Sequence, residues 1–323
     1  MGEIFAGRYE LMSSIADGGM GSVWQVRDHR DGTVKAAKLL RQSDAGSLMR
    51  FIREQSVRID HAHVLTPDSW AGDDDRVLFT MPLVRGGSVA DLVGDFGPLP
   101  PAWTRAILDQ ALEGLGAVHA AGYVHRDVKP ANLLLDPTGA AHPHVRVSDF
   151  GVAAPLDQPR MTRASQVIGS PGYLSPEQLQ GADPDPRQDV YGAGMVGLEM
   201  VTGLRPPQCL DAARTAPPAG QEALVALLLA AVADDPHARP DSAAQLRSRL
   251  AALELPPFGV GSQDDGPYVF DHVADEPRLP ETAPGPAPDP APTAGTRAPW
   301  PAIALLGLAA LLLIAAVVVV LTT

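Results

Sequence analysis

The first forty residues alternate short apolar runs with glycine-containing turns. Aliphatic, aromatic and β-branched side chains recur along 9–15, 22–28 and 33–40. Asp31-Gly32, before the third run, is a dipeptide that favours a tight hairpin turn. The pattern therefore predicts an antiparallel sheet at the start of the chain.

Helical spacing of apolar residues follows further along the chain. One helix is predicted over 45–59 and a longer one over 102–121, where apolar residues recur every three or four positions. Two short apolar strands, 133–135 and 145–147, come next. A small β-rich part thus precedes a larger, mainly helical part.

The composition changes sharply after Leu255. Twelve prolines lie within 256–301, where apolar residues are too sparse to form a core face, so this segment is predicted to be an extended, disordered linker. Residues 302–321 carry no charged or strongly polar side chain. At about 1.5 Å per residue, a helix of this length spans roughly the 30 Å of bilayer hydrocarbon.

This apolar segment predicts a single-pass anchor in the cell membrane. A buried helix of a soluble core is the alternative, but the segment lacks any polar face. Arg297 is the nearest basic residue and precedes the segment, which favours a cytoplasmic globular part. Residues 1–6 show neither a signal-peptide core nor a myristoylation pattern, so we expect the carboxyl-terminal segment alone to be the anchor.

Charge and cysteine content narrow the class of protein further. The formal net charge is −13, which argues against nucleic acid as a partner. Cys209 is the one cysteine, so an intrachain disulfide and a cysteine-based metal site are both excluded. Both features fit a cytoplasmic enzyme.

The turn at 16–23 has nearly the glycine spacing of a loop that folds over nucleotide phosphates, G-x-G-x-x-G-x-V. Glycine lets the backbone approach phosphate oxygens and offer its N–H groups, although an ordinary glycine hairpin fits the turn about as well. Ala16 replaces the first glycine of the pattern. The nucleotide-binding candidates here are Ile15, Ala16, Asp17, Gly18, Gly19, Met20, Gly21, Ser22 and Val23.

Lys38 strengthens the nucleotide-binding interpretation. It lies fifteen residues beyond Val23 in a predicted strand, next to small apolar residues that include the further candidate Ala36. Its ammonium group therefore needs an anion: nucleotide phosphates supply one, and Glu54 in the first predicted helix is the candidate for another. A solvated surface charge is the alternative for Lys38 and for Glu54, each taken singly.

The most specific motifs lie after the second predicted helix. Residues 125–132 read His-Arg-Asp-Val-Lys-Pro-Ala-Asn, and 149–151 read Asp-Phe-Gly. In this order and spacing, the two motifs resemble the catalytic and metal-binding loops of protein kinases. Over 9–253 the chain resembles in particular the membrane-anchored serine/threonine kinases of bacteria.

The resemblance implies a role for each polar residue of these motifs. Asp127 would accept the proton of the acceptor hydroxyl, and Lys129 would steady the γ-phosphate during transfer. Asn132 and Asp149 would hold the Mg²⁺ ions that bridge the phosphates. Lys38 would hold the α- and β-phosphates.

Further motifs imply structural roles. Residues 169–177 resemble the segment that shapes the substrate-docking floor of serine/threonine kinases, and Arg239 resembles the late arginine that pairs with Glu177. Asp189 resembles the aspartate that braces the backbone of the catalytic loop. His125 is expected to be a packed structural histidine and not the catalytic base.

The stretch between Asp149 and Glu177 contains the phosphorylation candidates Thr162 and Ser165. Autophosphorylation would add a charge of about −2 that docks near Arg126 and orders the loop. An unmodified flexible loop is the alternative.

The hinge between the two lobes is expected within 79–88, with Met81 and Val84 as candidates for nucleotide contacts. Pro82 occupies a position where relatives usually carry an acidic residue, and it removes one backbone donor. We expect a modest effect, because adenine contacts normally come from the neighbouring positions.

These observations predict an α+β protein with the bilobal protein kinase fold. A small antiparallel β lobe with one helix covers 9–84, and a larger, mainly helical lobe covers 85–253. The expected activity is transfer of the γ-phosphate of ATP, with Mg²⁺ or Mn²⁺, to serine or threonine hydroxyls of proteins in signal transduction. The expected partners are protein substrates, the membrane and a second copy bound through the lobes, although no residue decides the dimer.

Two alternatives to an active protein kinase remain. A scaffold that binds nucleotide without transferring phosphate has Ala16 as its only support in the sequence. A small-molecule phosphotransferase of related fold fits less well, because such enzymes typically lack the Pro-Glu segment and the late arginine. Transfer from radiolabelled ATP separates the kinase from the scaffold.

Overall fold

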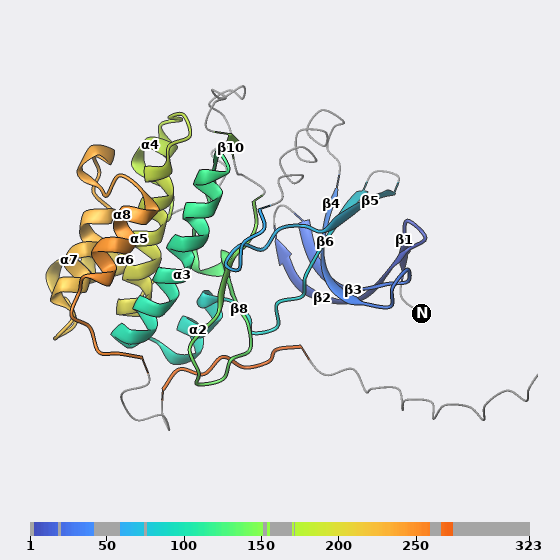
Figure 1. Ribbon diagram of the computed structural model, residues 1–323, viewed down its shortest axis with the longest axis horizontal. Coiled ribbons are helices and arrows are strands. Elements are labelled where there is room, and N and C mark those ends of the chain that lie inside the picture. Colours follow the sequence, from blue (N-terminus) through green and yellow to red (C-terminus); the bar gives the residue numbers. More distant parts are fainter. Residues whose placement is uncertain are drawn as a thin grey trace, which may run out of the picture. The chain divides into compact units, whose positions relative to one another are not determined.

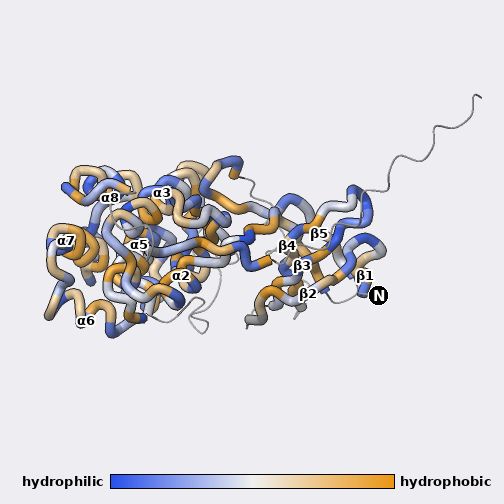
Figure 2. The backbone as a smooth tube through the Cα atoms, turned by 90° about the horizontal axis from the view of Figure 1, so that it is seen from below, coloured by the Kyte–Doolittle hydropathy of each residue, from blue (hydrophilic) through white to orange (hydrophobic). Residues whose placement is uncertain are grey.

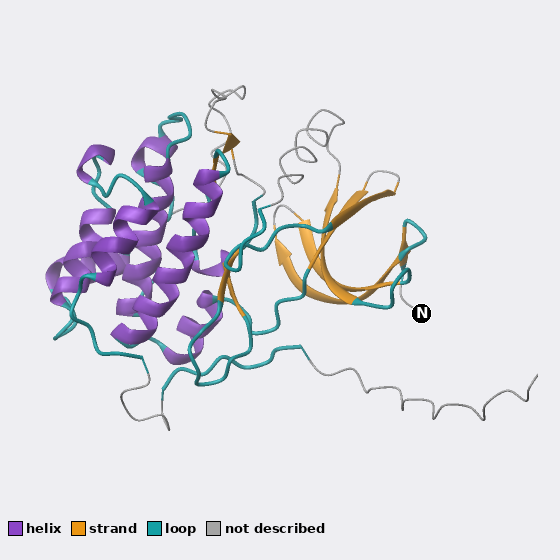
Figure 3. Ribbon diagram, in the orientation of Figure 1, coloured by secondary structure: helices purple, strands orange, loops and turns teal. Residues whose placement is uncertain are grey.

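A β-sheet and a set of packed helices make up the described part of the chain (Figures 1 and 3). The computed structural model describes residues 3–18, 21–41, 59–73, 76–150, 154–155, 170, 172–258 and 266–273. The predicted helix around Glu54 and the predicted membrane segment lie outside these residues. Within the described ranges, no helix is both long and apolar enough to cross a membrane.

The amino-terminal lobe is an antiparallel sheet of six strands in the order β1-β2-β3-β4-β6-β5. The three strands predicted at the start of the chain are confirmed, and the first continues to Gly18. Gly32 adopts a φ of 73° in the turn between β3 and β4, a conformation that favours glycine. The strands are β1 Ile4–Phe5, β2 Tyr9–Gly18, β3 Gly21–Asp28, β4 Val34–Arg41, β5 Ser69–Asp73 and β6 Arg76–Met81.

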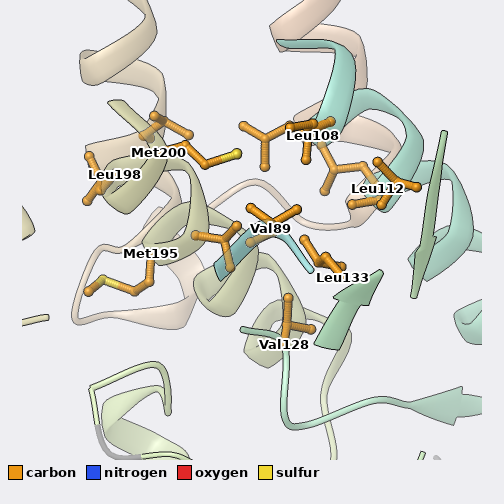
Figure 4. Packing of buried hydrophobic residues seen from close by; sticks show 14 of the residues in the cluster. Val89, Leu108, Leu112, Val128, Leu133, Met195, Leu198 and Met200 are labelled. Carbon is orange, nitrogen blue, oxygen red and sulfur yellow. The ribbon is translucent and has the colours of Figure 1, made fainter. Parts of the chain in front are cut away.

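The carboxyl-terminal lobe is mainly helical, and its core surrounds α5, which is buried along nearly all of its length. Figure 4 shows Leu108 of α3 and Met200 of α5 among the side chains of this core. Figure 2 colours α7 hydrophobic along most of its length, in keeping with its buried face against α5. The helices are α2 Val89–Phe96, α3 Pro101–Ala120, α4 Pro176–Leu179, α5 Pro186–Thr202, α6 Gln208–Thr215, α7 Glu222–Ala231 and α8 Ala243–Ala251, with short 3-10 turns η1 Pro130–Asn132 and η2 Pro236–Ala238.

Two small antiparallel ladders carry the loops that hold the predicted site. The two predicted short strands, β8 (Leu133–Leu135) and β9 (Val145–Val147), are confirmed, and they pair with each other. Strands β7 (Tyr123–Val124) and β10 (Ala154–Pro155) form the second ladder. The chain between β7 and β8 therefore begins and ends on paired strands.

The chain after α8 packs back onto the helical lobe in part. The Phe258 ring lies 5.1 Å from the Trp103 ring, measured between centroids, and Val269 is 2% exposed. The sequence predicts an extended, disordered linker over 256–301, and these two packed segments differ from that prediction. Single aromatic and β-branched side chains can fill a groove that other elements have built, and such docking leaves no periodic pattern in the sequence.

Candidate active site

Asp127 is the centre of a buried hydrogen-bond network between β7 and β8. Its carboxylate accepts a bond from Lys129 Nζ at 2.7 Å and from the backbone N–H of Ser170 at 3.2 Å. Lys129 Nζ also donates to Ser170 Oγ at 2.7 Å. Asn132 Nδ2 donates to the Asp127 carbonyl at 2.8 Å and to its carboxylate at 3.1 Å. The structure thus brings together the three residues that the sequence motif proposed as catalytic.

A buried carboxylate on α5 fixes the shape of this loop. The Asp189 carboxylate accepts hydrogen bonds from the backbone N–H groups of His125, at 2.8 Å, and of Arg126, at 2.7 Å. Its side chain has no exposed surface. Arg126 adopts a φ of 68°, which costs a non-glycine residue about 1–3 kcal/mol unless its surroundings hold it. The bracing role predicted for Asp189 therefore corresponds to two bonds at the strained turn.

His119, near the end of α3, completes the setting of Asp189. Its Nε2 lies 2.7 Å from Asp189 Oδ2. Burial alone would raise the pKa of Asp189, but the bond from His119 and the nearby positive groups lower it below its ordinary value. Sequence reasoning missed His119, because helical periodicity marks the apolar face of α3 and does not identify a polar partner on α5.

His125 occupies a structural position behind the loop. One ring nitrogen bonds the carbonyl of Ser148 at 2.9 Å, and the other accepts the backbone N–H of Asp127 at 3.3 Å. The ring also packs against Phe150, with 5.0 Å between centroids. His125 is fully buried, so the packed structural role expected from the sequence matches its surroundings.

Lys38 meets the second motif across the two lobes. It lies in the middle of β4, paired with Val23 of β3 on one side and Phe79 of β6 on the other, and its Nζ bonds Asp149 at 2.5 Å. Burial would raise the pKa of Asp149, but the ammonium group of Lys38 holds it below its ordinary value, so this carboxylate is ionised. The proposed partner Glu54 lies outside the described residues.

Asn132 and Asp149 are held next to each other by the β8–β9 ladder. The residue before Asp149, Ser148, donates its backbone N–H at 2.9 Å and its hydroxyl at 3.0 Å to the Asn132 carbonyl. The Asn132 amide nitrogen is committed to Asp127, which leaves the amide oxygen as its available ligand atom. A carboxylate and an amide oxygen are the hard donors that Mg²⁺ prefers, so the two residues fit that ion.

The rest of such a metal shell would come from outside these two residues. Among the described residues, no group of three or more histidine, cysteine or acidic side chains is placed to hold a metal ion. Mg²⁺ in enzymes commonly binds one or two protein groups and takes its other ligands from phosphates and water. The donor set therefore suits a metal that arrives with a nucleotide.

The glycine-containing turn is the end of the β2–β3 hairpin. Ala16 pairs with Val23, Asp17 with Ser22 and Gly18 with Gly21, while Gly19 and Met20 at the tip lie outside the described residues. Gly21 has a φ of 141°, and a Cβ added to it would lie 2.4 Å from the Leu39 carbonyl oxygen. Glycine is thus required at Gly21 by the neighbouring strand as well as by the backbone conformation.

Three of the remaining nucleotide candidates, Ala36, Met81 and Val84, lie towards the hinge, and Ile15 lies near the β2–β3 hairpin. Ala36 of β4 and Met81 of β6 are cross-strand partners, and Ile15 near the hairpin is 49% exposed. Val84 follows three residues after β6 in the connection to the helical lobe. Ala36 thus shares β4 with Lys38, and Met81 lies opposite Ala36 on β6.

A buried ion pair supports the predicted substrate-docking floor. Both terminal nitrogens of Arg239 donate to Glu177, at 2.7 and 2.8 Å, and the Arg239 side chain has no exposed surface. Burial opposes ionisation of Glu177, but the bonds from Arg239 lower its pKa below the ordinary value. Gln178 beside it donates to the Arg126 carbonyl at 3.1 Å and so ties α4 to the catalytic loop. Sequence reasoning missed Gln178, for which no motif or periodicity gives a signal. Thr162 and Ser165 lie outside the described residues.

Comparison with known proteins gives matches over the same region. A family profile described as the protein kinase domain matches residues 9–244. Serine/threonine-protein kinase PknA of Mycobacterium tuberculosis is 36% identical over 216 residues, which cover 64% of this chain and 49% of that protein. Serine/threonine-protein kinase PkaB of Streptomyces coelicolor is 38% identical over 209 residues, which cover 62% of this chain and 49% of that protein. Serine/threonine-protein kinase pkn3 of Myxococcus xanthus is 31% identical over 280 residues, which cover 79% of this chain and 51% of that protein. The chain spans about half the length of these relatives.

Proposed function

Because the chain belongs to the protein kinase family, we propose that it transfers the γ-phosphate of ATP to serine and threonine hydroxyls of proteins. The observation that carries the proposal is the network in which Lys129 bridges Asp127 and the hydroxyl of Ser170. A small aliphatic hydroxyl thus already lies beside the predicted base. The relatives named above are serine/threonine-protein kinases, which supports the same activity.

Asp127 is the proton acceptor in the proposed reaction. The acceptor hydroxyl oxygen attacks the γ-phosphorus, its proton passes to Asp127, and the bond from the γ-phosphorus to the bridging oxygen of ADP breaks. Lys129 lies 2.7 Å from Asp127. In this proposal it offsets the negative charge of the γ-phosphate during transfer. Mg²⁺, held by Asn132 and Asp149, would neutralise the phosphate oxygens when bound.

Lys38 positions the nucleotide in this proposal. Its 2.5 Å bond to Asp149 places the lysine and one metal-ligand candidate at the same point. Phosphate oxygens are negatively charged and a divalent metal ion is positively charged. The ammonium group of Lys38 beside the carboxylate of Asp149 therefore suits a metal–nucleotide complex, the lysine facing phosphate and the aspartate facing the metal. Phosphoryl transfer depends mainly on this positioning and charge neutralisation.

Asp127→Asn tests the proposed base. We expect the rate of transfer from radiolabelled ATP to a generic basic protein to fall on the order of 10²- to 10⁴-fold, with nucleotide affinity retained. Asp109→Ala, in α3 where the side chain pairs with Arg247 of α8, is the matched control and keeps the wild-type rate. Undiminished turnover in Asp127→Asn would overturn the assignment, and a folded wild type that binds nucleotide but transfers no phosphate would favour the scaffold.

We also propose that Thr162 or Ser165 is a site of autophosphorylation. Arg126 lies beside the base on the strained turn of the loop, where a phosphate would find a cation. Phosphopeptide mapping should find the modification in wild type and not in Asp127→Asn. A Thr162→Ala, Ser165→Ala double variant should lose activity, and full activity in that variant contradicts the proposal.

We propose further that residues 302–321 anchor the protein in the cell membrane with the kinase domain in the cytoplasm. Support comes from the uniformly apolar sequence of this segment and from Arg297 before it. Membrane fractionation of the full chain should recover it with lipid, and a variant ending at residue 296 should be released.

A homodimer through the lobes is a separate proposal. Cross-linking of the full chain tests it.

A further inference from the structure

Residues 266–273, which we call the hinge strap, lie beyond the end of the family match at residue 244. Figure 1 shows this orange segment alongside the loop that joins β8 to β9. Val269 exchanges two backbone hydrogen bonds with Gly139 of that loop, at 2.9 and 3.1 Å. Its side chain is 2% exposed and belongs to the core of the helical lobe, so the strap is part of the folded domain.

The strap also binds residues 85–87, which we call the connector because they join the hinge to α2. Arg85 donates from Nε to one carboxylate oxygen of Asp271 at 3.1 Å, and its Nη2 lies 3.0 Å from the other. The same nitrogen donates to the Val273 carbonyl at 3.0 Å. In return, the backbone N–H of His272 donates to the Arg85 carbonyl at 2.7 Å. Side-chain and backbone groups of Arg85 are therefore both fixed by the strap.

The connector is packed so closely that only glycine fits at its next position. A Cβ added to Gly86 would lie 2.3 Å from the Leu135 carbonyl oxygen and 2.7 Å from the Val269 side chain. The backbone N–H of Gly86 donates to the Leu135 carbonyl at 2.8 Å, and the backbone N–H of Leu135 donates to the Gly87 carbonyl at 2.9 Å. The connector thus lies between β8, which follows Asn132 directly, and the strap.

Aromatic rings hold the outer side of the strap. Phe270 stacks on Phe96 at the end of α2, with 6.3 Å between centroids and 8° between planes. Tyr268 packs on Phe270 at 4.6 Å. The strap is therefore attached on three sides: to the β8–β9 loop, to the connector and to α2.

We propose that the hinge strap is a positioning element for nucleotide binding, with Asp271 and Val269 as the residues that act through the connector. The inference rests on the proposed kinase function, because the connector follows the hinge candidates Met81 and Val84. With the strap bound, the connector has one backbone path between the hinge and α2. Without it, only a fraction of molecules present the binding-competent hinge, and the apparent nucleotide affinity falls in proportion to that fraction.

A comparison of two ion pairs of equal exposure tests the strap. Arg85 and Asp271 are 36% and 40% exposed, and Arg247 and Asp109 on the helical lobe are 37% and 38% exposed. Asp271→Ala in the full chain, purified in detergent, should raise the dissociation constant of a fluorescent ATP analogue with Mg²⁺ about threefold, as expected when a partly exposed pair is lost from the competent state. Asp109→Ala should leave the constant unchanged.

Steady-state kinetics separate positioning from a general loss of stability. Asp271→Ala should raise KM for ATP about threefold and leave kcat within about twofold, because the catalytic loop is not touched. Val269→Ala should raise KM further, since it removes buried contacts with both the connector and the core. Asp271→Glu, which keeps the carboxylate, should restore most of the affinity.

The outcomes are separable from failure of the kinase proposal. A wild type that binds the analogue but transfers no phosphate rejects the proposed activity, while the two dissociation constants still test the strap. Equal constants for Asp271→Ala, Asp109→Ala and wild type overturn the strap, as does a lower kcat at unchanged KM. Should Asp271→Ala not fold, Asp271→Asn keeps the side-chain volume and serves the same comparison.

Discussion

Glu177→Ala is the substitution whose cost follows most directly from the structure. It removes both charge-assisted bonds to Arg239, at 2.7 and 2.8 Å, and leaves the guanidinium group without its anionic partner. The Arg239 side chain has no exposed surface and Glu177 is only 16% exposed, so the pair is largely shielded from water. Three backbone carbonyls still accept from Arg239: those of Ala233, Arg187 and Asp234.

The magnitude follows from the cost of an unpaired buried charge. Removing one partner of a buried pair costs about 3–5 kcal/mol, and the three remaining carbonyl bonds place the expected loss near the lower end, about 3 kcal/mol. For a domain of this size each kcal/mol lowers the melting temperature by roughly 2–4 °C, so Tm should fall by about 6–12 °C. Replacing both partners, in Glu177→Met, Arg239→Leu, should cost less than the single change, because no buried charge remains.

Thermal unfolding followed by circular dichroism at neutral pH measures these differences. Asp241→Ala is the control, since it breaks the pair with Arg187 in which Asp241 is 65% exposed, and it should cost at most about 1 kcal/mol. The reasoning is refuted if Glu177→Ala has the same melting temperature as Asp241→Ala. It is also refuted if the double variant is less stable than Glu177→Ala.

Two further predictions concern the hairpin and the effect of acid. Gly21→Ala should lower the free energy of unfolding by about 1–3 kcal/mol, because its Cβ would lie 2.4 Å from the Leu39 carbonyl oxygen at a φ of 141°. Gly116→Ala, with nothing within 4 Å of the added Cβ in α3, should raise it by about 0.5–1 kcal/mol in urea denaturation, and equal effects would contradict this contrast. The folded-state pKa of Glu177 lies below its ordinary value of 4.5, so its contribution to stability is complete above that pH and is lost as the pH falls through the folded pKa. The Tm difference between wild type and Glu177→Ala should therefore shrink below about pH 4, and a constant difference would be the contrary result.

Local signals in the sequence were sufficient for the elements that carry the site. Alternating apolar runs predicted β2, β3 and β4, and short apolar runs predicted β8 and β9. The motif residues Asp127 and Asn132 lie five positions apart, so a tight loop brings them together whatever the rest of the fold does. The pair of Glu177 with Arg239 required the family resemblance, because 62 residues separate them.

Partners chosen by tertiary packing were not readable in this way. Lys38 bonds Asp149 across 111 residues, and His119 bonds Asp189 across 70. Neither distance in sequence has a periodic signature. Lys38 and Asp149 meet only when the two lobes pack, and His119 and Asp189 meet only when α3 packs on α5 within the helical lobe. The periodicity of an amphipathic helix tells on which face of the helix a polar residue lies. It does not tell which partner that residue contacts, because the partner depends on which element packs on that face.

The hinge strap shows which part of such a contact a sequence does carry. Tyr268, Val269 and Phe270 form one short apolar run between Pro267 and Asp271, too short to build a core of its own, so this segment cannot fold without the lobe it covers. The lobe side is different, because Gly86-Gly87 directly after the hinge marks a backbone that other atoms approach closely. A Cβ at Gly86 would meet Leu135 on one side and Val269 on the other, so the glycine accommodates both neighbours at once. The close approach was therefore open to prediction from the connector, whereas the identity of the approaching segment depended on the three-dimensional path of the tail.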